Sequence, residues 1–141
     1  MAYYEDINQL MYLIGKQIRI NDKKYGACFG ILLGIQRDYL VVQTHNNHVF
    51  YYRSQYISKL SEARRGVLPV GYHKDIRVVM TFDFLHLLRS FHNRILLVNL
   101  GGPHQLTGMI VGVEKDELIM EIGGNMIKLS INDIWYAEHK P

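Results

Sequence analysis

The sequence contains one pattern of apolar, glycine and turn residues twice, and this internal repeat constrains the fold more than any other feature. One copy spans about residues 5–60 and the other about residues 82–137. Each copy begins with apolar residues at the i, i+3, i+4, i+7 spacing of one buried helix face. These residues are Ile7, Leu10, Met11 and Ile14 in the first copy, and Phe84, Leu87, Leu88 and Phe91 in the second. We therefore expect a short amphipathic helix at the start of each copy.

Five short strands should follow each helix. The expected strands lie at 18–20, around Gly30 and Gly34, at 39–42, at 49–52 and near Ile57, and in the second copy at 95–98, around Gly108 and Gly112, at 118–122, at 126–129 and near Ile134. Glycine weakens a flat strand, so two glycines within one apolar strand indicate sharp bending around a tiny barrel. This is the layout of an SH3-like or Sm-like barrel. The predicted fold is mainly β with short α, a tandem duplication of a bent barrel preceded by a helix.

The domain organisation follows from the repeat. We expect a first helix-plus-barrel unit at 1–60, a partly packed linker at 61–80 and a second unit at 81–141. Apolar residues in the linker indicate packing; they are Val67, Leu68, Val78 and Val79. Because units of this size are marginally stable alone, the two should pack face to face or meet copies in other chains.

Composition excludes several classes of protein. A hydrophobic content of 48% in 141 residues argues against disorder, and a net charge of +3 is too small to indicate nucleic-acid binding by itself. The chain has neither an apolar run of the roughly 20 residues that cross a bilayer nor the layout of a signal peptide, so we expect a protein kept inside a cell. Cys28 is the single cysteine and forms no internal disulfide, although an intermolecular one stays open.

The candidate catalytic and metal-binding residues all favour structural roles. His45 and His48 flank Asn46-Asn47, but a structural zinc site needs four ligands and no second pair is present. Cys28 aligns with Leu106 of the second copy, which indicates a small buried hydrophobe. We therefore predict no catalytic residues, no cofactor and no metal.

The remaining candidates are turn residues and aromatic residues. Asp38 and Asp116 occupy equivalent hairpins, where aspartate bonds nearby backbone N–H groups. Gly101-Gly102-Pro103 reads as a turn because it lacks the Gly-Lys-Ser/Thr of a phosphate loop. Two aromatic pairs, Tyr51 with Tyr52 and Trp135 with Tyr136, lie on strands, so one member of each should be core and the other an exposed partner-binding residue.

Several of these residues resemble a known family. Asn99-Leu100-Gly101-Gly102-Pro103, followed by Gly108 and by Asp116-Glu117-Leu118, resembles the repeats of spore coat protein B and related small coat proteins of endospore-forming bacteria. The stretches 49–52 and 56–60 are similar to the end of that repeat. The first copy departs from the pattern, with Lys24-Tyr25-Gly26 in place of the Gly-Gly-Pro turn, and the chain lacks the serine- and lysine-rich tail of coat protein B.

The resemblance implies a structural protein of the spore coat, made in the mother cell cytoplasm, deposited on the forespore and bound to other coat proteins or to itself. No catalytic residues come with it. Exposed strand edges and aromatic faces would make these contacts.

Two other functions stay open. The same strand order suggests an Sm-like RNA-binding protein, but the Sm pattern has asparagine where this chain has Val42 and Met120, and Arg-Gly where it has Arg53-Ser54 and Ser130-Ile131. An enzyme with a small-ligand cleft between the two units is the third alternative, although no convergent set of acid, base and nucleophile is evident.

Overall fold

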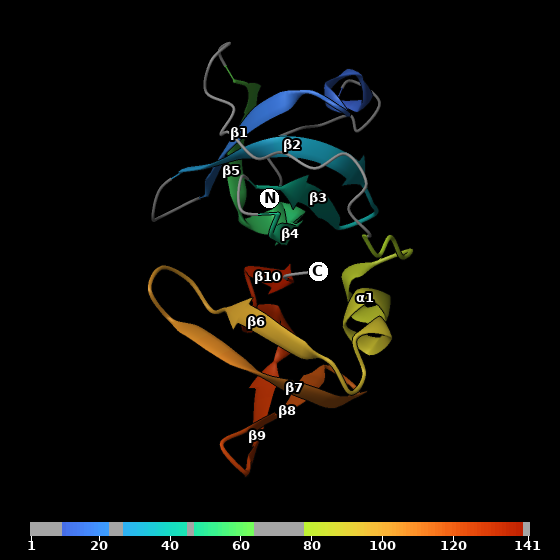
Figure 1. Ribbon diagram of the computed structural model, residues 1–141, viewed down its shortest axis with the longest axis vertical. Coiled ribbons are helices and arrows are strands. Elements are labelled where there is room, and N and C mark those ends of the chain that lie inside the picture. The colour runs from blue at the N-terminus through green and yellow to red at the C-terminus, as the bar shows by residue number, and fades with distance from the viewer. Residues whose placement is uncertain (1–9, 23–26, 45–46, 64–77, 140–141) are drawn as a thin grey trace.

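The computed structural model describes residues 10–22, 27–44, 47–63 and 78–139. Within these ranges the chain forms ten strands, one α-helix and three short 3₁₀ helices (Figure 1). The strands are β1 (Gln17–Asp22), β2 (Ala27–Ile35), β3 (Tyr39–Gln43), β4 (Val49–Arg53), β5 (Ile57–Glu62), β6 (Ile95–Asn99), β7 (Gln105–Glu114), β8 (Glu117–Ile122), β9 (Asn125–Ser130) and β10 (Tyr136–His139). The helices are α1 (Phe84–Ser90), η2 (Met11–Leu13), η3 (Ser54–Tyr56) and η4 (Ile131–Asp133). The prediction of a mainly β protein with little helix is confirmed.

All ten strands belong to one antiparallel sheet with the order β5-β1-β2-β3-β4-β10-β6-β7-β8-β9. The first five strands form one half and the last five the other, and both halves place their own fifth strand before their first. β4 pairs with β10 at the junction, where Tyr51 lies opposite Ala137. Face-to-face packing, one of the two expected arrangements, is not what joins the units at this junction. They join edge to edge, because β10 satisfies the backbone N–H and C=O groups along the edge of β4.

Each half-sheet is strongly curved. β4 and β5 lie at opposite ends of the first half, yet only the three residues of η3 connect them. Four inter-strand spacings of about 4.8 Å would hold these strands roughly 19 Å apart in a flat sheet. Three residues of 3₁₀ helix advance only about 6 Å. The half-sheet must therefore bend until its ends approach one another. The five residues 131–135, which include η4, impose a similar bend between β9 and β10.

Irregularities in strand pairing lie at matching places in the two halves, each beside a glycine. The pairing of β2 with β3 shifts register between Leu32 and Gly34, and that of β7 with β8 shifts between Ile110 and Gly112. Such bulges bend a strand and increase its twist. Gly30 and Gly108 act differently, because a Cβ atom would lie 2.4 Å from the Gln43 carbonyl oxygen and 2.6 Å from that of Glu121, respectively. The neighbouring backbone comes too close for any side chain there.

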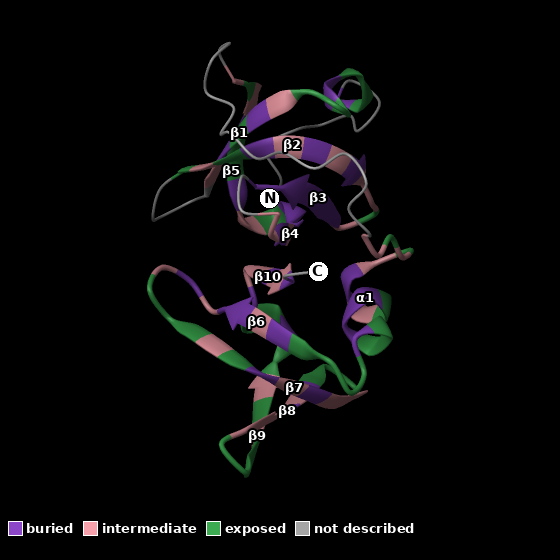
Figure 2. Cartoon of the chain, in the orientation of Figure 1, coloured by how far each residue is buried: buried purple, intermediate pink, exposed green. Residues whose placement is uncertain are grey.

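Two hydrophobic cores lie on opposite sides of β3 and β4. The first core contains the interior of the first half, including Leu13, Ile18, Leu40 and Tyr52. The second core contains the interior of the second half, three buried residues of α1 with its C-cap Phe91, and residues on the other face of β3 and β4; the latter are Tyr39, Val41, Val49 and Tyr51. Alternate residues of the two strands thus serve different cores, as a period of two dictates. Figure 2 shows β3 buried along its length and β9 largely exposed.

The two predicted helices have different outcomes. Phe84, Leu87, Leu88 and Phe91 are all at most 1% exposed, as predicted for α1. The described part of the first helical stretch is instead the 3₁₀ turn η2, in which Leu10 and Leu13 are buried while Met11 is 52% and Ile14 39% exposed. A 3₁₀ helix has three residues per turn, so residues i and i+3 share a face and the expected stripe is wrong. Ile7 lies outside the described residues.

The linker is described only from Val78 onward, so Val67 and Leu68 lie outside the described residues. Val78 and Val79 pack against the second core. Within the described ranges, no helix has the length and apolar character needed to span a membrane.

Candidate interaction surface: the seam and the two free edges

The seam between the halves is defined here as the paired strands β4 and β10 together with Trp135, which precedes β10. Arg53 at the end of β4 is buried, and its Nη1 donates to the carbonyls of Ile131 at 2.6 Å and Ile134 at 3.4 Å. Its guanidinium also lies 5.2 Å from the centre of the Phe84 ring. Burial lowers the pKa of Arg53, whereas Tyr56 and Asp38 raise it. Arginine stays protonated even so, and it ties η4 to the first half with charge-assisted hydrogen bonds.

The predicted aromatic residues all lie at this seam. Tyr51 is 0% and Tyr52 is 6% exposed, so the expectation that one of the two is available to a partner is wrong. The reason is the central position of β4, whose two faces are covered by different cores. Trp135 and Tyr136 are partly exposed. Trp135 stacks on Tyr56 with 4.7 Å between ring centres.

Buried tyrosines also hold the end of the linker. The hydroxyl of Tyr51 accepts a hydrogen bond from the Val79 N–H at 3.3 Å, and that of Tyr39 accepts one from Thr81 at 2.8 Å. Burial raises the pKa of Tyr51 to about 12, and Tyr39 adds to the effect. Tyr51 is therefore a neutral structural group rather than a reactive one.

Asp38 has a role that the sequence did not reveal. Its Oδ1 accepts a hydrogen bond from the Phe84 N–H at 2.8 Å, so a residue of the first half helps to cap α1 in the second. Asp83 is the N-cap itself and accepts from the His86 N–H at 2.9 Å. Asp116 lies in the exposed turn between β7 and β8, where its carbonyl accepts from the Ile131 N–H at 2.8 Å.

The Gly101-Gly102-Pro103 segment connects β6 to β7. Gly101 and Gly102 have φ values of +104° and +58°, which favour glycine. The Asn99 side chain closes the turn by accepting from the Gly101 N–H and donating to the Gly102 carbonyl, both at 2.8 Å. A Cβ on Gly101 would lie 3.2 Å from the Trp135 ring, so the turn packs against the seam.

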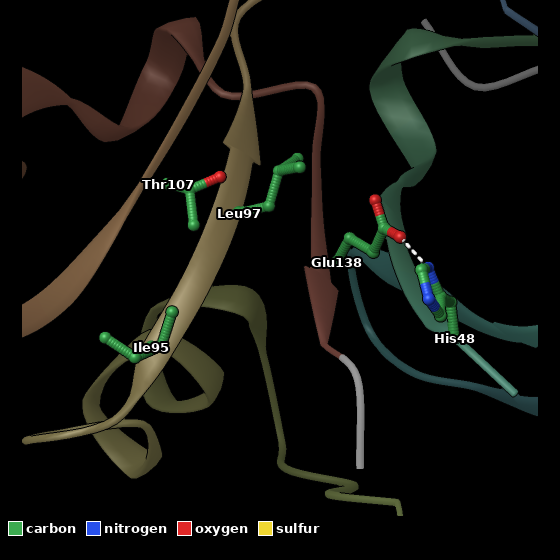
Figure 3. A pocket seen from close by; sticks show the side chains of 5 residues that line it. All are labelled: His48, Ile95, Leu97, Thr107 and Glu138. Atoms are coloured by element: carbon green, nitrogen blue, oxygen red, sulfur yellow. Dashed lines mark hydrogen bonds and ion pairs between the residues drawn. The ribbon is translucent and has the colours of Figure 1, made fainter.

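A pocket of about 230 Å³ lies beside the seam (Figure 3). Its lining comes from both halves and consists of His48, Ile95, Leu97, Thr107 and Glu138. His48 Nδ1 and Glu138 Oε1 point toward one another and form an ion pair when the imidazole is protonated. The volume is below the roughly 300–1,000 Å³ of ligand pockets, and its acid and base are paired with each other. Thr107 contributes the remaining polar side chain of the lining.

Metal and thiol chemistry have little support in the described ranges. No cluster of three or more histidine, cysteine or acidic residues able to hold a metal is found there, and His45 lies outside them. Cys28 packs against the first core, as its alignment with Leu106 predicted. Burial, with Glu138 adding to it, raises the pKa of Cys28 to about 12, so the thiol is protonated and unreactive at neutral pH.

The outermost strands, β5 and β9, form the two edges of the sheet. The Ala63 N–H bonds to Gln17 in β1, so by alternation the backbone groups of Leu60 and Glu62 point outward. The Ile131 N–H bonds to Asp116, so those of Lys128 and Ser130 point outward from β9. Among the strands that the structure describes, none covers either edge.

Comparison with known proteins does not assign the chain. No protein-family model matches the sequence, and neither does any curated protein. The seam and the two edges are therefore the features from which function is inferred.

Proposed function

We propose that this chain is a structural assembly protein that acts by protein–protein pairing at its sheet edges, as a component of the bacterial spore coat. The proposal rests on the β4–β10 seam, where two strand edges pair with each other. The outermost strands β5 and β9 could make the same kind of contact with another chain. Exposed strand edges are templates for pairing with another chain.

The proposal includes a tandem duplication of one Sm-like or SH3-like barrel module. Three observations support it: the equal strand order of the two halves, the register shifts at Gly34 and Gly112, and the close backbone approach at Gly30 and Gly108. A sheet that curls until its first and last strands approach one another has the geometry of a small barrel.

The spore coat assignment follows the resemblance of the 99–103 turn, Gly108 and the 116–118 segment to coat protein B repeats. The partners would be other coat proteins or further copies of this chain, recruited after synthesis in the mother cell. No catalytic step is part of this role. The small pocket and the protonated Cys28 are in keeping with it.

Sm-like RNA binding is the alternative. Val42 and Met120, which stand where the Sm pattern has asparagine, are 0% exposed. Side chains at these points cannot reach a base, which weighs against this alternative. A titration with single-stranded RNA at two salt concentrations separates the cases, because phosphate-driven binding weakens steeply as salt rises.

The proposal is tested in sporulating cells that carry the tagged chain. We expect the protein to appear in the mother cell and to co-purify with the coat fraction of mature spores. A Gly30→Ala, Gly108→Ala variant, which destabilises the fold at both close backbone approaches, should be depleted from that fraction relative to a Gly112→Ala control. Synthesis in vegetative cells but not during sporulation would contradict the coat assignment.

A further inference from the structure

We infer that copies of this chain join head to tail, with β9 of one copy pairing antiparallel to β5 of the next. The inference rests on the proposed function, since it names the partner of the free edges as a second copy. β9 occupies in the second half the position that β4 occupies in the first, and β5 occupies the position of β10. The seam within the chain is therefore a template for a contact between chains.

The template specifies the register. Ala137 of β10 lies opposite Tyr51 of β4 in the seam. Leu60 of β5 is the equivalent of Ala137, and Lys128 of β9 is the equivalent of Tyr51, so Leu60 and Lys128 should lie opposite each other between chains. The outward backbone groups belong to matching residues, because both Leu60 and Lys128 direct their N–H and C=O groups away from their own sheet. β5 and β9 lie at opposite ends of the sheet, so they cannot pair within one molecule (Figure 1).

Exposed apolar side chains lie where this contact requires them. At the seam, α1 covers the outer face of β3 and β4, with Phe84 against Tyr39 and Phe91 against Tyr51 at ring separations of 6.0 and 5.8 Å. In a head-to-tail pair, residues 10–14 of the next copy, which include η2, take the place of α1. That segment exposes Met11 and Ile14.

The face that would receive this segment is also apolar in part. Ile119 of β8 and Met126 of β9 stand at the positions of Val41 and Val49, and Met126 is 63% exposed. Met11 and Ile14 of the next copy would thus contact Met126 and Ile119 at the opposite end of the copy before it. Their burial would stabilise the contact by the hydrophobic effect.

Charge complements the same register. Lys128 and Glu62 are both exposed, and Glu62 lies 4.0 Å from Lys16 of its own chain. In the specified pairing Glu62 is diagonal to Lys128 on the same face of the sheet. Long side chains interact across such diagonals. Lys128 and Glu117 replace the buried Tyr51 and Tyr39 of the seam, so the contact between chains is more polar than the seam and is reversible. Because the two surfaces differ, the contact is heterologous and generates rings or filaments.

The first test is a disulfide cross-link in a Cys28→Ser background. Ser61 and Ile127 are the equivalents of Glu138 and Phe50, a directly opposed pair without mutual hydrogen bonds, whose Cα atoms are about 4.5 Å apart in antiparallel sheets. This spacing suits a disulfide. A Ser61→Cys, Ile127→Cys variant should give a ladder of covalent oligomers on a non-reducing gel.

The matched control is Ser61→Cys with Lys128→Cys. This shift of one residue puts the two thiols on opposite faces of the sheet, so it should remain largely uncross-linked. A reduced sample of each variant should show the circular dichroism of the parent, which establishes that both are folded. Equal ladders from both variants, or none from either, would overturn the specified pairing.

The second test uses charge reversal and light scattering. Lys128→Glu and Glu62→Lys should each weaken self-association by about threefold to tenfold, and the double variant should restore it. A wild-type chain that is monomeric at every concentration examined would overturn the head-to-tail contact. If that monomer still entered the spore coat, the proposed function would stand with a different partner at the edges.

Discussion

Replacing Gly108 with alanine should destabilise the protein, whereas replacing Gly112 in the same strand should not. A Cβ on Gly108 would lie 2.6 Å from the Glu121 carbonyl oxygen and 2.6 Å from the Ile122 side chain, so β8 would have to move away from β7. Overpacking of this kind costs about 1–3 kcal/mol. The lower entropy of an unfolded alanine returns about 0.4–1 kcal/mol. The net loss for Gly108→Ala is therefore about 1–2 kcal/mol.

Gly112 is the matched control because no atom lies within 4 Å of a Cβ built there. Gly112→Ala should leave the free energy of unfolding unchanged or raise it by up to about 1 kcal/mol. Urea unfolding followed by circular dichroism at one fixed protein concentration measures both variants. In thermal unfolding, Gly108→Ala should lower the midpoint by roughly 2–8 °C. Equal effects of the two substitutions would refute the close-approach reasoning.

Three further predictions follow from the seam and its surroundings. Asp38→Ala should lower the free energy of unfolding by about 1 kcal/mol, since it removes the acceptor for the Phe84 N–H. Asp116→Ala should lower it by less, and thermal melts of the two variants compare them. Burial, and then Arg94, lowers the pKa of His139, so below about pH 6.5 the unfolded chain binds a proton that the folded chain does not. Stability should therefore fall as pH drops from 7 to 5, and His139→Gln should flatten that slope in urea titrations; an unchanged slope contradicts the assignment. Because the pKa of Cys28 is about 12, iodoacetamide at pH 8 should modify the folded protein more than about a hundredfold more slowly than the urea-unfolded chain, as mass spectrometry would show.

Much of the local structure could be predicted from the sequence. The apolar spacing in 84–91 identified the three buried residues of α1 and the buried C-cap residue Phe91, and alternation with glycines and turn residues identified most strand positions. These features depend on neighbours within a few residues, which the amino-acid pattern records directly. The same rule misplaced the first helical stretch, because Leu10 to Leu13 adopt the tighter 3₁₀ spacing.

The candidate site was much less predictable. Tyr51 and Tyr52 look like an ordinary half-exposed pair, and both are buried only because β4 lies between two cores. Asp38 looks like a turn residue, and its bond to Phe84 joins residues 46 positions apart. No motif around Arg53 predicts its hydrogen bonds to the carbonyls of Ile131 and Ile134. Each role depends on long-range packing that no local spacing encodes.

The sequence by itself therefore determined the repeated order of strands, the glycines at their bends and the apolar face of α1. Only the tertiary structure decided that β4 pairs with β10, which turns two curved halves into one sheet and leaves β5 and β9 as its edges. The physical reason is that side-chain periodicity specifies which face of a strand is buried, whereas every strand edge offers the same N–H and C=O groups. Which edges meet is set by the shape of the whole fold.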